Sequence, residues 1–343
     1  MWAVMFLLMS LAVHVVIESA VQLVFAQRSG VWTYLSEFRE KAKQAGLSLD
    51  QYAQKVGLDP YLGWGKEEVR RHALPPLVEK TATVLFVGDS VTAGHDVIAG
   101  KEDYPALLAD QWGKRGIEVV NLAARGYGVD QMWLKVLLQA GGYHPNVIVF
   151  AYIPHDLIRP ASDFNFGLPK PKFQFSGSHV ALNLADGMAE FQRSYDSSRS
   201  GFHLSWWFIS RYWDNKEYYV PKLFLGYYED LFQQLGEGLA QLSKESKIPI
   251  IVVKLTNFRH FRGFEELSHL AASSLVQSRN VNGSDVRYMD MDECVPAKAK
   301  TLGLELEKEY AHHPSPVGHK LFAECLSSFM EPIVFKPVSA QSP

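Results

Sequence analysis

The sequence has few cysteines and lacks the common motifs for binding metals, nucleotides or nucleic acids. Its only two cysteines, Cys294 and Cys325, form neither a metal-binding motif nor a disulfide framework. The sequence does not decide whether the two form a single disulfide bond with each other. It has no glycine-rich phosphate loop and no run of basic residues, and the formal net charge of −3 argues against nucleic acid as the main partner. We therefore expect no metal and no organic cofactor.

Internal repeats, low-complexity tracts and a disorder signature are also missing. Charged residues make up 21% of the 343 residues and aromatic residues 13%, which is ample material for a hydrophobic core. This length suits one large domain, or one domain with appendages.

The N-terminus lacks positive charge, because no Lys or Arg precedes Arg28. Residues 1–27 are apolar over a length that suffices for one membrane span of about 20 residues. His14 and Glu18 interrupt this run, and a charge near mid-membrane costs about 2.5–3.5 kcal/mol on insertion scales. We predict a membrane anchor or export signal, with the rest of the chain membrane-anchored or secreted, in the periplasm. A buried N-terminal helix is the alternative.

The remainder of the chain divides at a change of pattern near residue 80. Residues 28–80 are polar and mostly helical in pattern, with Ser48 and Asp50 as candidate helix caps. In residues 81–335, short apolar runs alternate with helical stretches, which predicts a parallel sheet covered by helices on both sides. The expected strands are 83–87, 118–123, 146–152, 248–255 and 286–291, and the expected helices are about 103–115, 129–141, 222–246 and 316–330.

Residues 157–220 interrupt this alternation. Residues 169–184 resemble a hairpin, and the aromatic segment 202–213 has a helical pattern. A long insertion beside the binding edge of a sheet suits a lid or specificity region, and a packing flap without substrate contact suits the pattern equally well.

The run "TVLFVGDSVTAGHD" breaks from an apolar strand into Gly88, Asp89 and Ser90. A serine at this position often only caps the next helix. It can instead be a nucleophile, provided that the fold supplies a base and donors for an oxyanion. Gly88 allows the backbone to approach closely, and the amide of Ser90 is itself a candidate oxyanion donor.

Candidate partners of Ser90 lie at other predicted strand ends and before the last helix. The segment "EYAHHPSPVGHKLFAE" offers His313 as the base, with His312 beside it, and His319 fits a packing role within the helix. Gly126 in "NLAARGYGVDQ" has an unhindered amide, and His155 and Asp156 in "VFAYIPHDL" directly follow a strand. In parallel sheets such strand ends meet at the ligand-binding edge.

These segments, in this order, resemble four blocks of the SGNH, or GDSL, hydrolase family. "GDSVTAGH" is similar to the block of the nucleophile, "NLAARGYGVDQ" to the second block of a bacterial subgroup with a GYGTDQ-like string, "YHPNVIVFAYIPHDL" to the third and "HHPSPVGHKLFAE" to the fifth. "LDPYLGWG" and the hairpin also look like that subgroup. The resemblance implies a flavodoxin-like three-layer α/β/α sandwich with a parallel sheet and a catalytic Ser-His-Asp set. It also implies oxyanion donors from Ser90, Gly126 and an Asn side chain.

The sequence departs from the family pattern at two positions. His155 stands where the family has the oxyanion Asn, and a histidine there could titrate near pH 6–7. The family's acid lies three residues before the catalytic histidine, which gives Tyr310 for His313 and Glu309 for His312. Either His313 is the base without its usual acid, or the pair is Glu309 and His312. Asp156 could supply the acid, although its usual role in the family is structural. Asp89 is also expected to have a structural role.

From this resemblance we expect a serine esterase acting on an O-acetyl group of a carbohydrate or on a lipid ester through an acyl-enzyme at Ser90. Two alternatives stay open. The same Ser-His chemistry could transfer an acyl group to a hydroxyl, or the chain could be a catalytically degenerate protein that binds an envelope glycan.

Overall fold

The computed structural model describes most of the predicted sheet-and-helix unit and part of the segment before it. The described residues are 40–59, 62–161, 164–165, 168–169, 173–176, 179–182, 225–256, 264–277, 283–309 and 313–335. The predicted membrane anchor or signal at 1–27, the aromatic segment 202–213 and His312 lie outside them. None of the described helices is both long enough and apolar enough to cross a membrane.

The core of the molecule is a six-stranded sheet in the order β1-β3-β2-β4-β9-β10. All neighbouring strands are parallel except the edge pair β1–β3, which is antiparallel. The strands are β1 Arg70–His72, β2 Ala82–Val87, β3 Ile117–Asn121, β4 Val147–Tyr152, β9 Ile250–Lys254 and β10 Val286–Asp290. The five parallel strands follow the flavodoxin-like order 2-1-3-4-5, so the predicted fold class is confirmed.

Residues 70–72 differ from the prediction, which placed them in a mostly helical extension. They form the short edge strand β1, in which Arg70 pairs with Asn121 and His72 with Val119. Three polar residues at the rim of a sheet carry little hydrophobic pattern, because only one face of such a strand is covered.

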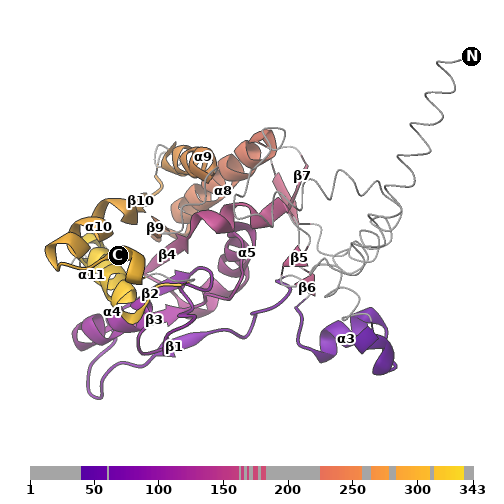
Figure 1. Cartoon of the computed structure of the whole chain (residues 1–343), viewed down its shortest axis with the longest axis horizontal. Coiled ribbons are helices and arrows are strands. Elements are labelled where there is room, and N and C mark those ends of the chain that lie inside the picture. Colours follow the sequence, from indigo (N-terminus) through magenta and orange to yellow (C-terminus); the bar gives the residue numbers. More distant parts are fainter. Residues whose placement is uncertain are drawn as a thin grey trace, which may run out of the picture.

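Helices cover both faces of the sheet (Figure 1). On one face lie α5 Val129–Gln139, α8 Leu225–Ser246 and α9 Phe264–Gln277, which pack on alternate strand residues such as Leu85 and Val87. On the other lie α4 Tyr104–Trp112, α10 Met291–Thr301 and α11 Pro316–Val334, which pack on Val84 and Phe86. The strands are apolar on both sides because both sides are buried.

Helix boundaries follow local capping signals. Ser48 is the N-cap of α3 Leu49–Lys55 and forms a capping box with Gln51, as predicted for Ser48, whereas Asp50 lies inside the first turn. Ser315 caps α11 by accepting from the amide of Gly318 at 3.1 Å. The start of α11, directly after His313, is therefore fixed by hydrogen bonds of the chain itself.

The two cysteines form a disulfide. Cys294 of α10 and Cys325 of α11 are bonded across 31 residues of sequence. The disulfide, which the sequence alone did not decide, thus joins two helices that cover the same face of the sheet.

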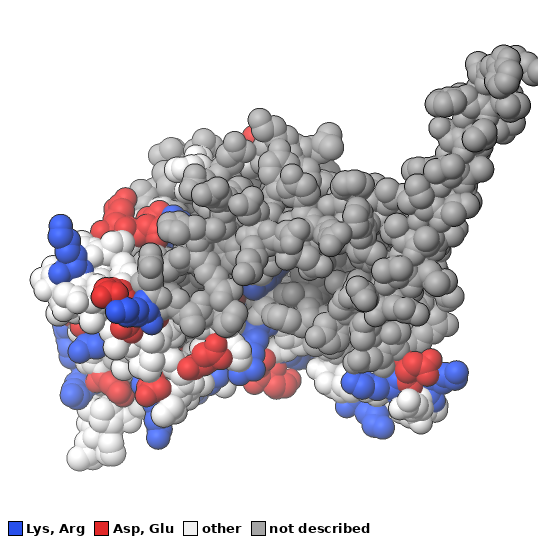
Figure 2. All heavy atoms as spheres, viewed as in Figure 1, with Lys and Arg blue, Asp and Glu red and all other residues white. Residues whose placement is uncertain are grey.

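Outside the main sheet, the predicted hairpin is present as β7 Phe173–Ser176 and β8 His179–Leu182, which pair in antiparallel register. A second small pair joins β5 Phe164–Asn165 and β6 Leu168–Pro169. Over the described part of the face in Figure 2, Lys and Arg alternate with Asp and Glu, so neither sign of charge dominates there.

Candidate active site

The carboxyl end of β2 positions Ser90 by a turn that only a small residue permits. A Cβ atom on Gly88 would lie 2.8 Å from the carbonyl oxygen of Ala151, which is too close for any side chain. The Asp89 carboxylate accepts a hydrogen bond of 2.9 Å from the amide of Val91, and this bond closes the turn. Ser90 is consequently held at the strand end with 8% of its surface exposed.

Ser90 and His313 meet although they lie 223 residues apart in the sequence. The Ser90 Oγ and His313 Nε2 atoms are 2.9 Å apart. On the other side of the ring, His313 Nδ1 lies 2.9 Å from Asp96 Oδ2. A hydroxyl, an imidazole and a carboxylate therefore form a continuous hydrogen-bonded chain, the arrangement of a serine nucleophile with its base and orienting acid.

The sequence reasoning did not identify Asp96 as a functional residue. It sits six residues after Ser90, in a left-handed backbone conformation with φ of 67°, which Asp tolerates better than most residues. Its side chain is 53% exposed. The sequence candidates for the acid were Glu309 and Asp156, whereas Asp96 lies 217 residues before His313 and no motif joins the two.

The alternate pair, Glu309 with His312, is only partly visible. His312 lies outside the described residues. Glu309, at the end of the 3-10 helix η7 Leu306–Glu309, accepts a hydrogen bond from the Ser315 hydroxyl, and its backbone carbonyl accepts one of 2.7 Å from the Ser315 amide. Glu309 therefore braces the cap of α11, and its catalytic pairing with His312 stays a prediction.

Behind the nucleophile lies a buried charged cluster, formed by Asp89, Asp156 and Arg159. Both carboxylates are fully buried, and the Arg159 side chain is 9% exposed. Arg159 donates to Asp156, lies 3.8 Å from Asp89 and donates to the carbonyl of Tyr127 at 2.6 Å. Burial and the neighbouring Asp89 raise the pKa of Asp156 well above its ordinary value.

His155 is joined to this cluster. An Arg159 nitrogen lies 3.1 Å from His155 Nδ1, and because guanidinium only donates, Nδ1 must accept. Burial, aided by the charge of Arg159, lowers the pKa of His155 to about 3. The expectation that His155 titrates near pH 6–7 is therefore wrong. Its ring is neutral at ordinary pH and carries its one proton on Nε2, which leaves Nε2 as a donor.

Gly126 lies in the loop between β3 and α5, with φ of 73°, a conformation that favours glycine. Residues of the "LDPYLGWG" segment brace this loop. The Trp64 indole donates to the carbonyl of Arg125 at 2.6 Å, and the Tyr127 hydroxyl donates to the carbonyl of Trp64 at 2.6 Å. The segment thus holds both neighbours of Gly126.

His319 has the packing role that the sequence predicted. It is fully buried in α11, stacks on Tyr104 and accepts from the Tyr104 amide at 3.3 Å. Burial lowers the pKa of His319 to about 4, so its ring stays neutral.

The comparisons with known proteins were made by sequence and by structure. No protein-family model matches the sequence, and no curated protein matches it. Among solved structures, the chain is similar to a psychrotrophic esterase from Pseudoalteromonas at 13% identity and a TM-score of 0.41, covering 74% of this chain and 98% of that one. It is also similar to an acetylxylan esterase from Geobacillus stearothermophilus, at 15% identity and a TM-score of 0.40 over 76% of this chain and 97% of that one.

A third similar structure is a lipolytic protein of the G-D-S-L family from Desulfitobacterium hafniense, at 14% identity and a TM-score of 0.40 over 72% of this chain and 99% of that one. These similarities are distant. The assignment of roles to the site therefore rests on the geometry of the chain's own residues.

Proposed function

We propose that the protein is a serine esterase of SGNH type, which acts through an acyl-enzyme at Ser90. The observation that carries the proposal is the chain of two 2.9 Å contacts from Ser90 Oγ through the His313 ring to Asp96. Such a chain activates a hydroxyl that is otherwise a weak nucleophile.

In the acylation step, Ser90 Oγ attacks the ester carbonyl and His313 Nε2 takes the hydroxyl proton. Asp96 accepts a hydrogen bond from the Nδ1–H group of His313 and stabilises the imidazolium that forms. His313 then returns the proton to the leaving alcohol, and the acyl group stays on Ser90. Water attacks the acyl-enzyme in the second step, with His313 again taking a proton, and Ser90 is released with the carboxylic acid product.

The oxyanion would be bound by the amides of Ser90 and Gly126 and by His155 Nε2. Arg159 supports the last assignment, because its bond to His155 Nδ1 leaves the ring proton on Nε2. Losing one such donor typically lowers the rate about 10²–10³-fold, and a donating His155 would retain part of that contribution.

The substrate class that we propose is an ester, either an O-acetyl group on a carbohydrate or a lipid ester. Acyl transfer to a sugar hydroxyl and glycan binding without turnover stay as alternatives. We also propose that the folded unit lies outside the cytoplasm. The Cys294–Cys325 disulfide supports this, because such bonds persist mainly in oxidising compartments.

The first test is labelling of the full chain by a fluorophosphonate probe. Wild type should be labelled on Ser90, and Ser90→Ala should lose the label. Ser328→Ala is the matched control, because Ser328 is an exposed serine of α11 and its variant should keep the label. A label that persists in Ser90→Ala, or a folded wild type that takes no label, would contradict the proposal.

Hydrolysis then separates the alternatives. Ser90→Ala should lower kcat for acetyl esters at least about 10³-fold. A panel of p-nitrophenyl esters of increasing chain length and acetylated xylo-oligosaccharides would separate carbohydrate from lipid preference. Labelling without hydrolysis, but with acetyl appearing on an added sugar acceptor, would favour the transferase.

A further inference from the structure

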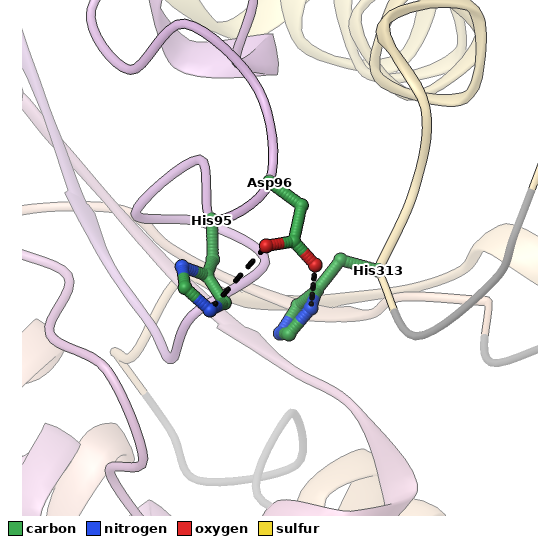
Figure 3. A group of neighbouring side chains, drawn as sticks. All are labelled: His95, Asp96 and His313. Carbon is green, nitrogen blue, oxygen red and sulfur yellow. Dashed lines mark hydrogen bonds and ion pairs between the residues drawn. The ribbon is translucent and has the colours of Figure 1, made fainter.

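Around the base lies a set of possible metal-ligand atoms, of which the proposed esterase chemistry uses those of Asp96 and His313 but not those of His95. Two imidazoles and one carboxylate, from His95, Asp96 and His313, place their ligand atoms within 4.8 Å of one another. Figure 3 shows Asp96 between the two rings, with one carboxylate oxygen toward each. The sequence carries no motif for such a site, since Asp96 and His313 lie 217 residues apart.

The spacing fits a small transition-metal ion. Zinc binds imidazole nitrogen at about 2.0–2.1 Å and carboxylate oxygen at about 2.0–2.2 Å, so tetrahedral ligand atoms lie roughly 3.3 Å apart. His95 Nε2 lies 3.5 Å from Asp96 Oδ1, and His313 Nδ1 lies 2.9 Å from Asp96 Oδ2. Small side-chain movements would bring all three onto one ion. Two imidazoles with one carboxylate suit zinc and its neighbours, whereas Mg²⁺ and Ca²⁺ prefer oxygen alone.

His95 is well placed to become a ligand. Its Nε2 faces Asp96 at 3.5 Å, beyond an ordinary hydrogen bond, and its Nδ1 is buried without a hydrogen-bond partner among the described residues. Its ring meets that of His313 edge to face, with centroids 4.6 Å apart. Arg125 acts electrostatically on His95 and opposes a cation, but its side chain is exposed, so water screens this repulsion.

We propose that His95, Asp96 and His313 form a binding site for a divalent transition-metal ion such as Zn²⁺, and that the ion shuts off the base. The ion would take the lone pair of His313 Nδ1, whose proton moves to Nε2. A neutral imidazole carries only one ring proton, so Nε2 then holds a proton and cannot accept the one from Ser90. No net proton is released and no covalent bond to Ser90 changes, but the hydrogen bond between Ser90 Oγ and His313 Nε2 reverses, because Nε2 becomes the donor. The inhibition rests on the proposed function, whereas the binding itself does not.

The test begins with binding alone, measured by equilibrium dialysis of the full chain against Zn²⁺. Wild type and Ser90→Ala should bind the ion equally, because Ser90 is not a ligand. His95→Gln should weaken binding at the site at least about 10- to 100-fold. His144→Asn is the matched control, because it removes an exposed imidazole before β4 at the opposite end of the strand and Asn tolerates the left-handed backbone there.

Hydrolysis by wild type and by His95→Gln is then measured across the same zinc range, each relative to its own zinc-free rate. Wild type should lose activity with the midpoint found by dialysis, and His95→Gln should need at least about 10-fold more zinc. Equal binding by His95→Gln and wild type overturns the site. Binding at this site without loss of hydrolysis overturns the inhibition. If zinc-free wild type shows no esterase activity at all, the proposed function is refuted. The dialysis result, which does not depend on hydrolysis, still stands.

Discussion

The two groups of side chains on either side of Ser90 differ in their exposure to water. The buried side consists of Asp89, Asp156, Arg159 and His155, in which the two carboxylates are fully buried and the Arg159 side chain is 9% exposed. The exposed side consists of His95, Asp96 and His313, in which the Asp96 side chain is 53% exposed and that of His313 is 19% exposed.

This difference separates stability from catalysis. Charges on the buried side have left water and depend on each other, so removing one leaves the others unpaired. Charges on the exposed side retain water, and changing one costs little folding free energy. We therefore expect substitutions of Asp89, Asp156 and Arg159 to lower stability most, with any loss of rate arising through His155, and those on the exposed side to lower the rate at little cost in stability.

The largest effect on rate is expected from Asp96→Asn. The amide cannot stabilise an imidazolium and can favour the wrong tautomer of His313, so kcat should fall about 10²–10⁴-fold. The free energy of unfolding should change by no more than about 0.5 kcal/mol, because the side chain is half exposed. Steady-state kinetics and urea unfolding measure the two quantities.

Glu309→Gln tests the alternate acid in the same assay. If Glu309→Gln slows hydrolysis as much as Asp96→Asn does, or if Asp96→Asn keeps the wild-type rate, the acid has been assigned to the wrong residue.

Arg159→Met should act chiefly on stability. It leaves buried carboxyl groups without their cation, and we expect a loss of about 3–5 kcal/mol in the free energy of unfolding, measured by urea denaturation. Asp156→Asn provides a milder variant, since the amide is of similar shape and its oxygen can still accept from Arg159. Its cost should be about 1 kcal/mol. Equal stability of Arg159→Met and wild type would contradict the claim that the buried side of Ser90 stabilises the fold.

Cys294→Ser sharpens the comparison from outside the site. The disulfide closes a loop across 31 residues, for which chain entropy alone predicts a contribution of about 3–4 kcal/mol. The loss should appear in urea unfolding while kcat of the folded variant at 25 °C stays near that of wild type, because neither cysteine belongs to the hydrogen-bonded chain of Ser90, His313 and Asp96. Wild type with its disulfide reduced is the control, and a large loss of kcat would mean that α11 needs the bridge to position His313.

The last expected effect is a pH dependence of stability. The pKa values of His155 and His319 are lowered to about 3 and about 4, whereas in the unfolded chain both histidines take up protons near pH 6.5. The unfolded state therefore binds more protons below pH 6.5, and stability falls as the pH decreases toward 4. Each histidine contributes a slope of up to about 1.4 kcal/mol per pH unit.

Urea unfolding at pH 7, 6 and 5 measures this slope. His155→Asn should reduce this slope by the share of one proton per chain, because one histidine fewer takes up a proton on unfolding. An unchanged slope would mean that His155 is already protonated in the folded state.

Much of the fold was readable because its strands are buried on both faces. Runs such as "TVLFV" and "NVIVFAY" stand out for that reason, and the alternation with helices gave the parallel sheet. The strand β1 escaped notice because its three residues are polar and only partly buried. The disulfide could only be left open, since whether two cysteines approach each other depends on how α10 and α11 pack.

Within the site, Ser90 and His313 could be named from their neighbours in the sequence. Asp96 could not, because its pairing with His313 depends on where the loop after β2 meets the start of α11. The neutral state of His155 was also hidden, since it follows from burial and from the charge of Arg159 rather than from the residue type. In both cases the sequence shows the residue but not the neighbour that determines its role, which is His313 for Asp96 and Arg159 for His155.

The position of β1 has a practical consequence for shortened versions of the protein. The change of pattern near residue 80 invites a cut there, yet β1 covers the outer edge of β3. A chain that begins after residue 80 would expose the unpaired amides and carbonyls of β3, which are a template for pairing with another chain. It would also lack Trp64, which braces the loop of Gly126. Such a fragment should self-associate through this edge, so the first residues of any minimal version belong before Leu62.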